Sequence, residues 1–186
     1  MTPWELPQSL SVGGKEWNIR TDFRAVLDAL RFFNDPEYEM DEKFLICLTI
    51  IYIDFDDMPP ELYEEAAEKA TEFIDMGIQE DKAKKPHMMD WEQDGQIIIP
   101  AVNRVLGREV RADKYLHWWT FLGAYLEIGE SLFQQVLAIR QKKMKGKKLE
   151  KWEKEFYSQN KSLVDLKARY TAEELEEQRR LNEILG

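Results

Sequence analysis

Hydrophobic residues recur every three or four positions along most of the chain, in segments separated by glycine, proline or short polar stretches. This spacing is typical of amphipathic helices. We predict helices over residues 23–33, 41–54, 61–76, 95–106, 113–129, 130–144, 149–157 and 171–185. Ahead of them, two short segments that alternate polar and apolar residues flank Gly13-Gly14, which is typical of a β-hairpin with a tight turn, at about 9–19.

This pattern predicts an all-α fold, in which a compact multi-helix domain carries a short N-terminal β-hairpin and a C-terminal helical tail. Residues 1–157 form the domain in this interpretation, and residues 158–186 form a helical extension. Local signals support the helix ends. Gly77 suits a left-handed C-cap, and Thr171 with Glu174 forms a capping box that begins the last helix.

The most apolar of these segments is 113–129, with Asp113 as its expected N-cap. A helix over this stretch gathers five large side chains on one face: Tyr115, Trp118, Trp119, Leu122 and Tyr125. Only a narrow polar line remains, which includes His117. A helix that is apolar around most of its circumference must be covered on several sides. We therefore expect this face to be either the core axis of the domain or a surface that a partner chain covers.

Composition favours one domain with an appended tail, because 186 residues with 44% hydrophobic and 12% aromatic content fit a globular protein. The formal net charge of −10 disfavours non-specific nucleic-acid binding by the whole chain. No apolar run is long enough to span a bilayer, and the first residues lack the regions of a signal peptide. A cytoplasmic protein is therefore expected.

The charge is uneven, because residues 140–169 hold eleven lysines and arginines against four acids, a net +7 that leaves −17 for the rest. The densest part is a candidate basic contact patch, which comprises Arg140, Lys142, Lys143, Lys145, Lys147 and Lys148. Three interpretations are open: a solvated helix junction, contact with an acidic face of another protein, and phosphate binding. We rank them in that order, so nucleic acid is the least favoured partner.

Two groups of acidic residues invite a metal interpretation, since carboxylates are ligands for Mg²⁺ and Mn²⁺. The first group is Asp54, Asp56, Asp57 and Glu61, and the second is Asp90, Glu92 and Asp94 with His87 nearby. Turn formation and the preference of helix N-termini for negative charge explain the first group equally well. The second group lacks a further His or Cys at ligand spacing. A polar loop is favoured in both places, and no metal or cofactor is predicted.

His117 and Cys47 are the remaining candidates for chemistry. His117 lies on the polar line of its segment, where hydrogen bonding or solvent exposure is the expected state. Cys47 lies in an apolar segment that would raise its pKa and hide it. The chain has no G-x-S-x-G, P-loop or G-x-G-x-x-G motif. We therefore predict no catalytic residues and a protein that is not an enzyme.

Two motifs give the chain a resemblance to a known family. Residues 90–107 begin Asp-Trp-Glu-Gln-Asp and end at a glycine turn, and residues 116–121 read Leu-His-Trp-Trp-Thr-Phe. With Phe55-Asp-Asp57 and Pro60-Glu61, they resemble the bacteriophage gene-product-fifteen family of tailed phages and prophages of Gram-positive bacteria. The match spans roughly 23–157. Pro100-Ala101 and Thr120 depart from the family pattern, in which a Tyr-Ala-Ala-type sequence and a basic residue are expected.

The resemblance implies a non-catalytic tail assembly protein in the cytoplasm of the bacterial host, one that acts as a chaperone for the tape-measure protein. The tail-tube protein and a neighbouring assembly chaperone are further implied partners, and a homo-oligomer is an open alternative. A structural virion component, such as a tail connector or completion protein, is the second hypothesis. A metal-dependent hydrolase that uses Asp54, Asp56, Asp57 or Asp90 is the third.

Overall fold

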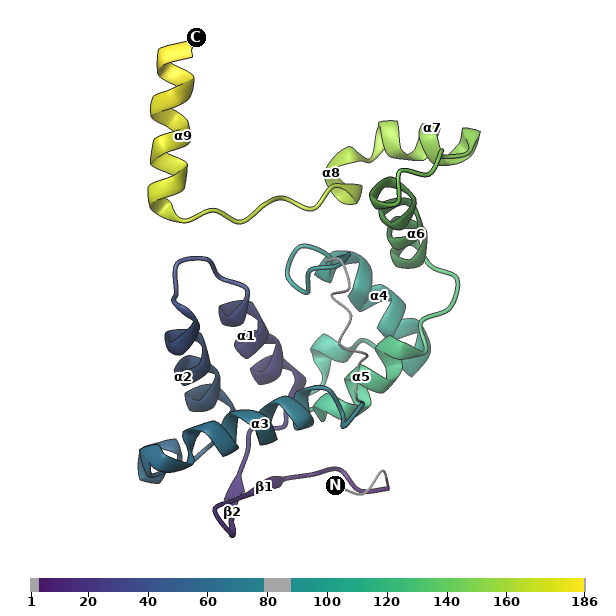
Figure 1. The fold of residues 1–186 in the computed structure, drawn as a ribbon. Helices are drawn as coiled ribbons and strands as arrows, with labels where there is room; N and C mark the ends of the chain where they lie inside the picture. The colour runs from purple at the N-terminus through teal and green to yellow at the C-terminus, as the bar shows by residue number, and fades with distance from the viewer. Residues whose placement is uncertain (1–3, 79–87, 186) are drawn as a thin grey trace.

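The computed structural model describes residues 4–78 and 88–185 and places α5 between α1, α3 and α4 (Figure 1). The two strands are β1 (Ser9–Val12) and β2 (Lys15–Asn18). The α-helices are α1 (Phe23–Phe33), α2 (Met40–Ile51), α3 (Tyr63–Ile74), α4 (Gly95–Leu106), α5 (Trp118–Leu126), α6 (Leu132–Met144), α7 (Lys151–Gln159), α8 (Lys161–Val164) and α9 (Ala172–Leu185). Three single turns of 3-10 helix also occur: η1 (Phe55–Asp57), η2 (Pro60–Leu62) and η3 (Val110–Ala112). The predicted all-α fold with an N-terminal hairpin is confirmed.

The hairpin forms where the Gly-Gly pair predicts it. Gly13 and Gly14 have φ angles of +60° and +75°, and the left-handed conformation at both central turn residues matches the twist of the strands. Leu10 pairs with Trp17 across the sheet, and both are buried. A two-stranded sheet needs a surface to pack on. The backbone N–H of Gly13 donates to the Glu65 carboxylate at 3.1 Å, so the turn rests on the start of α3.

α2 ends earlier than predicted, at Ile51 instead of residue 54. The Arg20 guanidinium donates to the carbonyl oxygens of Thr49, Ile50 and Tyr52 at 2.9–3.0 Å. These carbonyl groups lie at the helix end, where no intrahelical partner is available to the last of them. A bridge between Ile19 and Tyr52 turns the chain into an extended conformation at this point. A contact from a distant segment therefore sets the end of this helix.

α5 begins at Trp118, so the predicted helix start at Asp113 is wrong. Residues 113–117 do not form a helix, and a bridge joins Asp22 to His117. The backbone N–H of Leu116 donates to the Asp22 carboxylate at 3.1 Å, and the Leu116 carbonyl accepts from Phe23 at 3.0 Å. Tyr115 therefore does not lie on the face of α5 and is 53% exposed.

The two tryptophans of α5 are part of the core, since Trp118 is 1% and Trp119 is 8% exposed. Their indole N–H groups donate to the carbonyl oxygens of Ile74 and Phe73, each at 2.8 Å, at the end of α3. Leu122 and Tyr125 are partly buried against the same core. The face was predicted to be either the core axis of the domain or a surface covered by a partner chain. The two tryptophans lie in the core.

α9 stands away from the rest of the molecule, at the end of an extended linker (Figure 1). The predicted capping box is present: the Thr171 hydroxyl accepts from the Glu174 N–H at 3.1 Å, and the Glu174 carboxylate accepts from the Thr171 N–H at 2.8 Å. Every α9 side chain that the structure describes is exposed. Residues 161–164 instead pack on α6 through the buried Val164, and the domain boundary after residue 157 stays a prediction.

Replacement of Trp118 by alanine is expected to lower the free energy of unfolding by about 3–5 kcal/mol, because it leaves a cavity and an unpaired Ile74 carbonyl. Trp152→Ala is the control, since Trp152 is 50% exposed and its loss should cost less than about 1 kcal/mol. Urea denaturation followed by circular dichroism measures both. Equal losses for the two variants would contradict the central position of α5.

Candidate functional site

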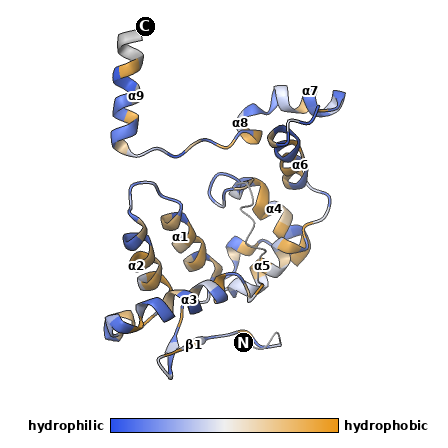
Figure 2. Cartoon of the chain, in the orientation of Figure 1, coloured by the Kyte–Doolittle hydropathy of each residue, from blue (hydrophilic) through white to orange (hydrophobic). Residues whose placement is uncertain are grey.

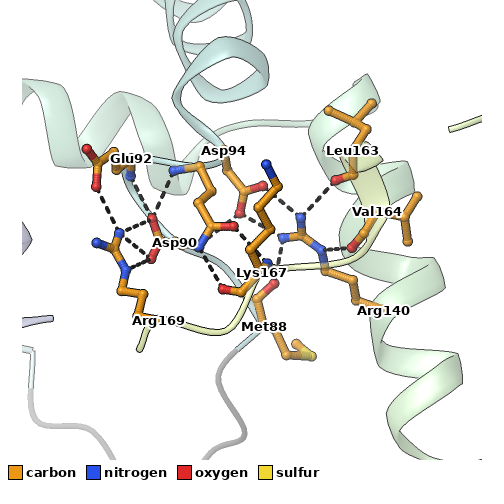
Figure 3. A network of polar contacts seen from close by, with 10 residues as sticks. Met88, Asp90, Glu92, Asp94, Arg140, Leu163, Val164, Lys167 and Arg169 are labelled. Atoms are coloured by element: carbon orange, nitrogen blue, oxygen red, sulfur yellow. Dashed lines mark hydrogen bonds and ion pairs between the residues drawn. The ribbon is translucent and has the colours of Figure 1, made fainter. Parts of the chain in front are cut away.

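A buried ion pair joins the start of α4 to α6 (Figure 3). The Arg140 guanidinium donates to both carboxylate oxygens of Asp94, at 2.7 and 2.8 Å. It also donates to the carbonyl oxygens of Val164 at 2.6 Å, Leu163 at 3.0 Å and Met88 at 2.9 Å. All five N–H donors of this arginine therefore have partners. The pair connects α4, α6, α8 and the segment before α4 in one place.

A second ion pair, between Asp90 and Arg169, attaches the linker that leads to α9 (Figure 3). Arg169 donates to both oxygens of Asp90, at 2.9–3.2 Å, and to the Glu92 carboxylate at 3.0 Å. Burial alone would raise the pKa of Asp90, but hydrogen bonds from the Gln93 N–H and from Arg169 outweigh it and lower that pKa. Gln93 and the Lys167 backbone exchange two hydrogen bonds, at 2.9 and 3.1 Å. The linker is thus fixed over residues 167–169.

These contacts correct the predicted basic contact patch. Arg140 is 6% exposed, so it does not belong to a surface patch. Lys142 donates to the Glu153 carboxylate at 2.6 Å, and Lys143 pairs with Asp165. The remaining members are Lys145, Lys147 and Lys148, which are exposed and form no ion pair with another described residue. The run of basic residues therefore divides into internal pairs and a smaller exposed group.

The two acidic groups do not converge on a metal site. Within residues 4–78 and 88–185, no three His, Cys, Asp or Glu side chains form a group that could hold a metal ion. Asp54 and Asp56 are exposed beside η1, and Asp90 and Asp94 are taken up by arginines. His87, the nearby histidine of the second group, lies outside the described residues.

His117 is a buried helix cap. Its Nδ1 accepts from the Trp119 N–H at 3.0 Å, so Nε2 carries the proton that is donated to the Pro7 carbonyl at 3.0 Å. Burial lowers the pKa of His117, which favours this neutral form. Cys47 is half-buried, and burial raises the pKa of its thiol to about 11. At neutral pH this cysteine is a thiol and a poor nucleophile.

An exposed apolar surface that the sequence analysis did not predict lies on α2. Met40, Phe44 and Leu45 are 54%, 40% and 45% exposed, and the Phe44 ring meets Phe33 of α1 edge to face, with centroids 5.5 Å apart. Figure 2 shows α2 as hydrophobic along most of its length. We call these four residues the α2 face. Its signal was present in the sequence, because residues 41–54 are apolar on nearly all sides and one domain core covers only one side.

Acidic side chains lie at the N-terminal end of this face. They are Asp35, Glu37, Glu39, Asp41 and Glu42, from the α1–α2 turn and the first turn of α2. Exposed apolar residues with a charged rim are typical of protein-binding surfaces. The described residues thus include an exposed apolar surface with acidic residues at one end.

The comparison with protein-family models decides the family. The model described as Bacteriophage Gp15 protein matches residues 4–166, which run from the hairpin through α8 and include the Leu-His-Trp-Trp segment. The chain belongs to the Bacteriophage Gp15 protein family. Searches of curated proteins and of solved structures gave no match.

Membership in the Gp15 family implies a bacteriophage structural or morphogenesis protein. The match extends beyond the predicted span of 23–157 at both ends and stops before α9. Both ion pairs have at least one member inside the matched region, and the α2 face lies entirely within it. In the part of this family member that the structure describes, no helix has the length and apolar character needed to cross a membrane.

Replacement of Arg140 by methionine is expected to lower the free energy of unfolding by about 3–5 kcal/mol. It leaves Asp94 charged and buried without its countercharge, with only the Asp90 N–H at 3.0 Å still donating to it. Arg108→Met is the matched control. Its partner is Asp113 at 2.8 Å, but the arginine is 51% exposed, so its loss should cost less than about 1 kcal/mol. Urea denaturation measures both, and hydrogen exchange should rise over residues 161–169 in Arg140→Met alone. Similar effects of both variants would contradict the role of the buried pair.

The lowered pKa of His117 predicts a pH dependence of stability. Because the folded state binds the proton more weakly than the unfolded chain, this contribution is fully present above the unfolded pKa of about 6.5 and is lost as pH falls toward the lower folded pKa. Between pH 7 and 5 the free energy of unfolding should fall by at most about 1.4 kcal/mol per unit. In His117→Asn, which keeps a capping oxygen, that fall should shrink. Urea titrations at several pH values measure the free energy of unfolding of both proteins. If this energy falls equally with pH in the wild type and in His117→Asn, the predicted role of His117 is refuted.

Proposed function

We propose that the protein is a phage tail assembly factor that binds helical segments of another tail protein without catalysis. The first candidate for the bound partner is the tape-measure protein, for which the protein would act as a chaperone in the host cytoplasm. The tail-tube protein and a neighbouring assembly chaperone are the alternatives. The observation that carries the proposal is the α2 face, an apolar surface with an acidic rim on a member of a bacteriophage family.

The geometry of this face suits a helical partner. Met40 and Phe44 are one helical turn apart, and Leu45 follows Phe44 about 100° further round the helix. A partner helix with apolar residues at three- and four-residue spacing would pack along such a row. The acidic rim would attract lysines or arginines that flank the apolar stripe of the partner. The tryptophans of residues 115–125 are buried, so we propose that the partner contacts α2 instead of that segment.

The same features favour a contact that can be released. The α2 face has four residues, three on α2 and one on α1, whereas a typical stable interface has about 20–30 residues on each side. Contacts at an exposed charged rim change association rates and weaken with salt. Transient binding is what a chaperone requires, whereas a permanent virion component needs a larger buried area.

Co-expression with fragments of the tape-measure protein encoded beside it tests the contact. Met40→Gln with Leu45→Gln should weaken capture of the fragments at least about tenfold, which corresponds to about 1.4 kcal/mol of binding free energy. The control pair is Leu126→Gln with Leu132→Gln, two residues that are 53% and 44% exposed on other helices. Both double variants should keep the melting temperature of the parent within a few degrees.

Equal capture by the two double variants would contradict a contact at α2. Mass spectrometry of purified virions separates the chaperone from its main alternative. A chaperone should be absent from mature particles, whereas a connector or tail-completion protein should be present at a stoichiometric level.

A further inference from the structure

A second pair of surfaces, made of residues other than the α2 face, has matching chemistry. One is α9, which holds five glutamates against two arginines and so carries a charge of −3. The other is the corner between α6 and α7, residues 145–154, which holds five lysines against two glutamates and carries +3. Both lie at the surface, and opposite charges of this size attract at short range.

Each of these surfaces also exposes large apolar side chains. Leu175 and Leu181 of α9 are 44% and 50% exposed. At the corner, Met144 and Trp152 are 48% and 50% exposed. The Trp152 indole N–H donates to Glu150 at 3.1 Å, and its ring stays half exposed in a lysine-rich segment. Such a tryptophan is typical of a protein contact, since tryptophan is enriched among the residues that dominate binding energy. The two surfaces therefore carry opposite charges, and each also exposes apolar side chains that could pack together.

The α9 helix of one molecule does not cover the corner of that same molecule. The linker is attached by Asp165 to Lys143, by Lys167 to Gln93 and by Arg169 to Asp90. These contacts carry the chain away from α7, so that α9 begins beside the α1–α2 turn, where the Ala172 N–H contacts Glu37 (Figure 1). That turn is acidic and would repel the glutamates of α9. The α9 of the same molecule therefore leaves the corner open, and the α9 of a second copy can reach it.

We propose that the α6–α7 corner binds the α9 helix of a second copy of this chain. Leu175 and Leu181 pack against Trp152 and Met144, while the α9 glutamates face the corner lysines. Reciprocal docking of two copies buries this contact twice and closes a dimer. The α2 face stays free in this arrangement, so self-association and the proposed tail-protein contact use different surfaces.

Charge-reversal variants of the full chain test this contact by sedimentation equilibrium at low salt. The wild-type chain should associate in a concentration-dependent way that weakens as salt is raised. Glu173→Lys with Glu177→Lys should sediment as a monomer, as should Lys147→Glu with Lys148→Glu. None of these four residues has an ion pair or side-chain hydrogen bond to another described residue. Both reversed chains stay net negative, at −6 and −14 from a starting charge of −10.

An equimolar mixture of the two reversed variants should restore association, because each basic α9 then meets an acidic corner and each acidic α9 meets a basic corner. Glu64→Lys with Glu68→Lys on α3 is the matched control, with the same change of charge at two exposed glutamates one turn apart, and it should associate as the wild type does. A wild-type chain that is monomeric at every concentration overturns the proposal. So does association that persists in both reversed variants, or a mixture that stays monomeric while both variants keep the melting temperature of the parent.

Discussion

Trp118 and Trp119 donate their indole N–H groups to the carbonyl oxygens of Ile74 and Phe73, in the last turn of α3. The last four carbonyl groups of a helix have no intrahelical partner and must find donors elsewhere when they are buried. Trp118 supplies a donor to the Ile74 carbonyl, and Trp119 adds one to the Phe73 carbonyl, which also accepts from the Met76 N–H at 3.1 Å. The two rings fill the space between α3 and α5. The arrangement requires α5 to begin at Trp118, and the His117 side chain supplies the cap that allows it. Leu-His-Trp-Trp is therefore a structural motif, and each residue in it has a separate structural role.

Much of the fold could be predicted from local signals. The two glycines specify a hairpin turn, the helical period marks the helices, and Thr171 with Glu174 marks the start of α9. The failures share one physical cause, which is contact with a distant segment. Residues 113–117 have an apolar pattern that a helix would also show, but Asp22 and Phe23 pair with their backbone and hold them outside the helix. The end of α2 depends in the same way on Arg20.

The candidate site was harder to predict, because identical residue types serve different purposes. Arg140 and Lys145 belong to one basic run, yet Arg140 lies one turn beyond the buried Val136 and points into the body, whereas Lys145 follows the end of α6. Helical spacing could have distinguished them, although only the structure shows Asp94 as the partner. The α2 face was missed for the opposite reason. An apolar helix in a small domain suggests a core position, although apolar residues on nearly all its sides indicate that one side must stay uncovered by a single core.

Hydrogen bonds and ion pairs connect the helices of the interior, and the exposed surface includes the α2 face with its acidic rim and the basic α6–α7 corner. The Asp94–Arg140 pair is buried and every N–H donor of its arginine has a partner, while the exposed apolar surfaces carry charges of both signs. The acidic rim of α2 and the lysines beside α7 would select different partners. This division is consistent with a morphogenesis protein whose work is binding.

Hydrogen exchange of the protein, alone and co-purified with a tape-measure fragment, tests this account most directly. If the α2 face is the contact with the tail protein, peptides over residues 40–51 gain protection in the complex, while peptides over residues 118–126 are protected equally in both samples. Unchanged exchange over α2, or a gain of protection over α5 on binding, would contradict the claim that α5 is the core and α2 is the binding surface.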